Sequence, residues 1–87
     1  MQINITQEDI DRASQYLIQN KCVYIDKCPV ALAITRERGV SATVQKDFMV
    51  VACLNFYYTP PEVVDFIEKY DNSATRDQCM PFSFELE

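Results

Sequence analysis

Hydrophobic positions near the start of the chain recur at the spacing of a helix. The segment of residues 7–19 follows Thr6, a residue type that caps helix N-termini, and it has acidic side chains in its first turn, where they complement the helix dipole. Its hydrophobic positions form one stripe: Ile10, Ala13, Tyr16, Leu17 and Ile18. We therefore expect an amphipathic helix that packs this stripe inward.

Two further segments carry the start signals of helices. Residues 30–34 are apolar on nearly every side and follow Pro29, which suits a first helical turn, while Gly39 stands where a left-handed residue would end the helix. The third helix begins at a Thr-Pro-Pro-Glu sequence, residues 59–62, which has the form of a capping box. Its apolar positions follow a helical spacing: Val63, Phe66, Ile67 and Tyr70. The second helix is expected to be the most buried of the three.

The remaining hydrophobic residues follow the patterns of strands. Residues 40–44 alternate between apolar and polar, and residues 45–47 predict a turn. Residues 48–54 are continuously apolar, which favours a central strand covered on both faces, although periodicity does not exclude a buried helix. We expect Tyr57 and Tyr58 to extend the sheet and residues 82–86 to form a last strand. The order α-α-β-β-α-β predicts one small α+β domain, residues 1–87, with an antiparallel sheet packed against helices.

Composition narrows the classes of partner. A chain of 87 residues with 48% hydrophobic content can build one modest core, and its thin stability margin favours a homo-oligomer. Thirteen acidic against eight basic residues give a net charge of −5, which argues against a nucleic-acid binder. The sequence shows no secretory leader and no apolar run of membrane-spanning length, so we expect a cytoplasmic protein without membrane contact.

The chain lacks the residues of common catalytic sites. Without histidine, a Ser–His or Cys–His nucleophile pair cannot form within the chain, and one glycine cannot build a phosphate-binding loop. The four cysteines lack the paired spacing of a zinc site and indicate buried, reduced thiols: Cys22, Cys28, Cys53 and Cys79. We therefore expect no enzyme, no cofactor and no metal. A thiol or metal protein that uses the cysteines stays an alternative.

Five residues form the candidate ligand site. Positive groups gather at Arg36, Arg38 and Lys46, which could bind an anion, and Tyr57 and Tyr58 could stack on a base or ring. The simpler interpretation is that the arginines complement a helix C-terminus, that the lysine solubilises a turn and that the tyrosines pack in the sheet.

Four segments together resemble a group of short tailed-bacteriophage proteins. They are ITQEDI at residues 5–10, CPVALAI at 28–34, PEVVDFIEKYD at 61–71 and PFSFEL at 81–86. The resemblance covers nearly the whole chain, carries no catalytic motif and agrees least over residues 40–59. It implies a role during infection, since small phage proteins of this kind inhibit host proteins or sequester cyclic-nucleotide immune signals.

The leading hypothesis is therefore a non-enzymatic counter-defence protein, an oligomeric sponge for a small anionic nucleotide. The first alternative is an inhibitor that binds a host defence protein through an acidic helix face around Glu62, Asp65 and Glu68. A second alternative is a phage protein whose role is purely structural.

Overall fold

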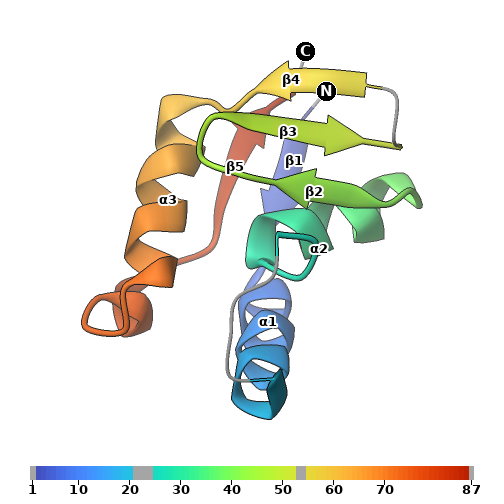
Figure 1. The fold of residues 1–87 in the computed structure, drawn as a ribbon. Helices are drawn as coiled ribbons and strands as arrows, with labels where there is room; N and C mark the ends of the chain where they lie inside the picture. Colours follow the sequence, from blue (N-terminus) through green and yellow to red (C-terminus); the bar gives the residue numbers. More distant parts are fainter. Residues whose placement is uncertain (1, 21–24, 53–54, 87) are drawn as a thin grey trace.

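The computed structural model describes residues 2–20, 25–52 and 55–86 (Figure 1). Its elements are β1 (Gln2–Ile5), α1 (Gln7–Asn20), α2 (Pro29–Arg38), β2 (Ala42–Val44), β3 (Phe48–Val51), β4 (Asn55–Tyr58), α3 (Pro61–Asp71), the 3₁₀ turn η1 (Arg76–Gln78) and β5 (Phe82–Glu85). All strand pairs are antiparallel within the described ranges. The predicted α+β class is confirmed.

The strands form two sheets where the sequence predicted one. β1 pairs with β5, with Ile3 opposite Phe84, and the other sheet has the order β2-β3-β4. The predicted order lacked β1 and did not include β4 as a separate strand, although Tyr57 and Tyr58 do extend the sheet as expected. β1 is only four residues long and finds its partner at the other end of the chain, so no local pattern pointed to it.

The continuous apolar run at residues 48–54 does not form one strand. β3 ends at Val51, and Ala52 takes a left-handed backbone conformation with φ of 58° at the turn towards β4. β3 is the central strand, as predicted, but cover on both faces was wrong. Met49 and Val51 are buried, whereas Phe48 and Val50 on the other face are only partly buried.

α2 lies in the middle of the fold, where it contacts α1, β1 and β2 (Figure 1). Its most buried residues include Val30, Ala31, Ala33 and Ile34, which confirms the prediction from its apolar run. The Cys28 thiol accepts a hydrogen bond from the Ala31 amide at 3.4 Å, and Gly39 ends the helix with φ of 67°. The residues at both ends of α2 therefore sufficed to predict where the helix begins and ends.

The two outer helices follow their predicted stripes with two corrections. On α3 the four apolar stripe residues are buried, and the Tyr70 hydroxyl lies 3.2 Å from the Ser14 hydroxyl of α1. On α1, Ile18 is 76% exposed, because the buried stripe ends near the middle of the helix. The proposed capping box at residues 59–62 is also wrong: Pro60 is the N-cap without a side-chain bond, and the Thr59 hydroxyl donates to the Gln45 carbonyl at 2.7 Å.

A buried carboxylate joins the N-terminal elements. Asp9 has no exposed surface, and its Oδ2 accepts hydrogen bonds from the backbone amide and hydroxyl of Thr6, at 2.9 and 3.0 Å. Arg36 of α2 donates to both carboxylate oxygens, at 3.1 and 3.0 Å, and also to the Asn4 carbonyl of β1 at 2.8 Å. This Asp9–Arg36 clamp therefore holds β1, α1 and α2 together.

Replacing Asp9 by asparagine is expected to destabilise the fold by about 2 kcal/mol at neutral pH, because a charge-assisted hydrogen bond is lost in a buried position. Burial alone would raise the pKa of Asp9, but the hydrogen bonds from Arg36 and Thr6 outweigh it and hold this pKa below its ordinary value of 3.8. The carboxylate therefore stabilises the fold above that pH, and this stability is lost as the pH falls through the lower folded-state pKa.

Urea unfolding from neutral to acidic pH measures both effects. The loss of stability below pH about 4 should be smaller in Asp9→Asn than in the wild type. Asp11→Asn, on the exposed face of the same helix, is the matched control and should behave like the wild type. Identical pH profiles for the wild type and Asp9→Asn would contradict the role of the clamp.

Candidate functional site

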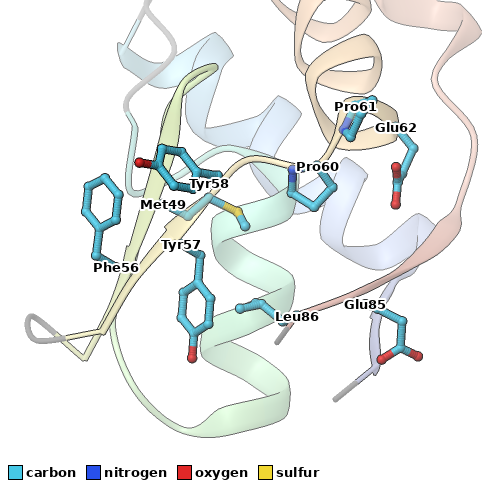
Figure 2. Close-up of a pocket in the computed structure, with 9 residues that line it drawn as sticks. All are labelled: Met49, Phe56, Tyr57, Tyr58, Pro60, Pro61, Glu62, Glu85 and Leu86. Carbon is cyan, nitrogen blue, oxygen red and sulfur yellow. The ribbon is translucent and has the colours of Figure 1, made fainter.

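A groove of about 500 Å³ lies between β4, the start of α3 and the end of β5 (Figure 2). It is lined by Met49, Phe56, Tyr57, Tyr58, Pro60, Pro61, Glu62, Glu85 and Leu86. Its volume is within the range of small-molecule and peptide side-chain sites. Residues from both faces of β4 contribute to the lining, so the groove follows the edge of that strand.

The outer edge of β4 carries backbone groups that point away from the sheet. The Thr59 amide donates to the Asp47 carbonyl at 3.3 Å. This bond determines which residues of β4 direct their backbone groups towards β3 and which direct them outward. Residues two apart point the same way in an antiparallel ladder, so Tyr57 pairs with β3 and the N–H and C=O groups of Phe56 and Tyr58 face outward. Within the described ranges, β4 has a strand on one side only.

The two edges of this sheet differ. At the β2 edge, the Val44 amide donates to the Ile25 carbonyl at 2.8 Å, so another part of the chain covers it. The segment Asn55–Tyr58 at the other edge contains no charged residue and no proline, two of the devices that protect an exposed strand. The β4 edge is therefore competent to pair with an added strand.

Aromatic side chains cover the outer face beside this edge. The rings of Phe48 and Phe56 stack with centroids 5.2 Å apart, and the Tyr58 ring meets Phe56 edge-on at 5.7 Å. Phe56 is 58% and Tyr58 83% exposed. We call Phe48, Phe56 and Tyr58 the aromatic face. Clustered exposed aromatic residues are typical of interaction surfaces.

The groove is acidic. Glu62 at the start of α3 and Glu85 at the end of β5 both line it, and its described lining includes no basic residue. Figure 2 shows these two carboxylates on the α3 and β5 side of the groove. The acidic helix face proposed from the sequence is exposed at Glu62, Asp65 and Glu68, so Glu62 belongs to both features.

The structure does not bring the five candidate ligand residues into one cavity. Arg36 is engaged in the clamp with Asp9, and Lys46 lines a hollow that also contains Asp71. Tyr57 points to the opposite side of β4 from Tyr58 (Figure 2). Arg38 and Tyr57 both line a smaller cavity, of about 170 Å³, next to the groove.

Sequence reasoning missed Phe56 and the edge on which it lies. The available signal was an uncharged run, Asn55–Tyr58, placed directly before two prolines. That run could be recognised as a separate edge strand only once the turn after Val51 was known, and neither glycine nor proline marks this turn.

Two of the four cysteines can be placed. Cys28 and Cys79 are buried and free, in agreement with their expected role as small apolar residues, whereas Cys22 and Cys53 lie outside the described residues. No group of three or more histidine, cysteine or acidic side chains comes together as a metal site in the described part of the chain.

Comparison of the chain with protein-family models, with curated proteins and with solved structures found no match. Among the described residues, none of the helices has the length and apolar character needed to cross a membrane. The phage resemblance stays a prediction, and the groove and its borders are the features of the described chain that bear most directly on function.

Cys28 is expected to resist alkylation in the folded protein. Burial raises the pKa of its thiol to about 11, so at pH 8 only on the order of one thiol in a thousand is ionised. Iodoacetamide labelling followed by peptide mass spectrometry measures the rate, with the urea-unfolded protein as the control. Labelling of Cys28 at the same rate in both states would show that this thiol is not buried.

Proposed function

We propose that this protein is a non-enzymatic binding protein that captures another protein through the β4 edge, the aromatic face and the acidic groove. The observation that carries the proposal is an uncharged strand edge, bordered by exposed aromatic rings, that opens directly onto a groove. In the setting that the phage resemblance implies, the partner is a host defence protein.

Strand addition explains why such an edge would be useful. An incoming extended segment gains main-chain hydrogen bonds from Phe56 and Tyr58, while pockets for its alternate side chains provide specificity. Fully burying a phenylalanine side chain contributes about 1.5 to 3 kcal/mol, so covering the exposed part of Phe56 contributes a share of that. Both sources of affinity lie within the four residues of β4.

The charge distribution supports a protein partner with basic groups. The chain has a net charge of −5, and the exposed acidic residues of α3 continue from the groove at Glu62 to Asp65 and Glu68. Opposite charges across an interface accelerate association and select the partner. The acidic-face alternative from the sequence and the β4 edge therefore describe neighbouring parts of one surface.

The nucleotide sponge is the second candidate, and the observation in its favour is the cavity shared by Arg38 and Tyr57. A guanidinium and a phenol ring on the walls of one cavity suit a small anionic ligand with an aromatic part. Its volume of about 170 Å³ is smaller than most ligand sites, so a nucleotide would also extend into the neighbouring groove.

Oligomerisation would also use the β4 edge. Two copies that pair antiparallel about a two-fold axis at Tyr57 would place Phe56 of each copy opposite Tyr58 of the other. This register keeps the aromatic faces on one side and uses all the outward backbone groups of both residues. The edge is thus self-complementary, which supports the homo-oligomer that the sponge requires.

Phe56→Lys is expected to weaken capture of the partner, because it places a charge at the centre of the aromatic face. Ile18→Lys is the matched control, since Ile18 is also a large exposed apolar residue and lies on α1, outside the groove lining. Tagged wild-type and variant proteins are expressed in host cells, and the proteins that co-purify are quantified by mass spectrometry. A specific partner should be retained by the wild type and the control and reduced at least about tenfold by Phe56→Lys, a loss of about 1.4 kcal/mol.

Thermal melting of both variants checks that their folds are intact. Capture of the same proteins, in the same amounts, by Phe56→Lys and the wild type would refute the β4 edge as the binding surface.

Arg38→Ala separates the sponge from the protein-binding function. Native mass spectrometry of the purified protein with cyclic and linear nucleotides should show ligand mass on the wild type and its loss in Arg38→Ala, if the sponge operates. Arg36→Ala is unsuitable for this test because it leaves the buried Asp9 carboxylate without its cation. Wild-type protein without added mass across the panel would exclude nucleotide sequestration.

A further inference from the structure

We propose that the segment captured at β4 is an extended strand with a lysine or arginine at the position opposite Tyr57, flanked by apolar residues. This inference rests on the proposed function and specifies its partner. It follows from the direction of the backbone groups of β4, from the shape of the groove and from its charge.

The backbone of β4 determines which side chains of an added strand point to each face of the sheet. Its main chain must bond to the outward N–H and C=O groups of Phe56 and Tyr58, so the two residues opposite them are hydrogen-bonded pairs. Directly opposed residues direct their side chains to the same face of a sheet. Those two side chains therefore lie on the aromatic face, and the residue between them, opposite Tyr57, points to the inner side.

The inner side at this point is the groove. Tyr57 points into it, and apolar side chains of Met49 and Leu86 line it beside the tyrosine ring (Figure 2). A long side chain that enters here would run along apolar surface before it reaches the Glu62 carboxylate at the start of α3. Lysine and arginine combine an apolar stem with a charged end, so the stem would contact the apolar lining and the charged end would reach the carboxylate.

Charge decides between the candidates for the inward position. An acidic side chain would be repelled by the Glu62 carboxylate, and an apolar side chain would gain no electrostatic attraction from it. A second copy of the chain would present Tyr57 at this position and would bring a second net charge of −5. A basic residue on a different protein complements the site in both shape and charge.

The two flanking side chains have a different environment. On the outer side they would meet Phe56 and Tyr58, whose rings are largely exposed in the free protein. Valine, isoleucine or an aromatic residue would cover these rings and favour the extended conformation. We therefore expect three consecutive residues of the partner strand to be apolar, basic and apolar.

Two short capped peptides test this pattern. One contains Val-Lys-Val at its centre and the other Val-Glu-Val, and both have the same polar residues on either side. Binding to the isotope-labelled full-length protein is followed by NMR titration, and amide hydrogen exchange is measured at each backbone N–H. The lysine peptide should slow exchange at Phe56 and Tyr58 and leave exchange at Val50, whose N–H faces β2, unchanged.

The lysine peptide is expected to bind about tenfold more tightly than the glutamate peptide, a difference of about 1.4 kcal/mol. Glu62→Gln should remove most of this difference. Glu68→Gln should preserve it, because Glu68 is also an exposed residue of α3 but lies outside the groove lining. Peptide-bound spectra of both variants also show whether the fold is retained.

Three results would overturn the inference. Equal affinity for both peptides, with Phe56 and Tyr58 protected, would refute the basic position and leave β4 as the binding edge. If the lysine peptide slowed hydrogen exchange at other amides, or at neither Phe56 nor Tyr58, strand addition would be refuted. The proposed function itself is tested separately, by the capture experiment with Phe56→Lys. Protection of both amides in the free protein that increases with its concentration would assign the edge to a second copy.

Discussion

The fold depends on one buried carboxylate. Asp9 is removed from water and remains charged because Thr6 and Arg36 donate to it, and the same arginine reaches the Asn4 carbonyl. A small domain has little apolar area with which to fix the direction of its helices, so a buried charge that must be satisfied constrains them strongly. The clamp positions α2 beside β1 and α1, and the hydrophobic core assembles around α2.

The position of α2 also explains which edge of the three-stranded sheet is left open. This helix contacts β2, and the chain near Ile25 bonds to the β2 edge, so one side of the three-stranded sheet is covered. At the β4 side, the prolines before α3 lead the chain away towards the groove. The sheet is thus asymmetric: its β2 edge is closed, and its β4 edge carries the aromatic face.

Arg36 illustrates how the same residue type can be read in two ways. A basic residue in the last turn of a helix can bind an anionic ligand or complement the helix dipole. In the structure Arg36 has a further role that neither prediction included. It neutralises a carboxylate from another helix, 27 positions earlier in the sequence. Arg38, two residues later, points elsewhere and lines a cavity with Tyr57.

The sequence by itself determined the elements with strong local signals. Pro29 and Gly39 delimited α2, and the stripe from Val63 to Tyr70 located the buried face of α3, because helix ends and helix faces depend on residues close in the chain. Only the tertiary structure decided that β1 pairs with β5, that the run after Phe48 turns back at Ala52 and that Phe56 lies at an edge. Strand pairing and edge position are relations between distant residues, so no local pattern encodes them.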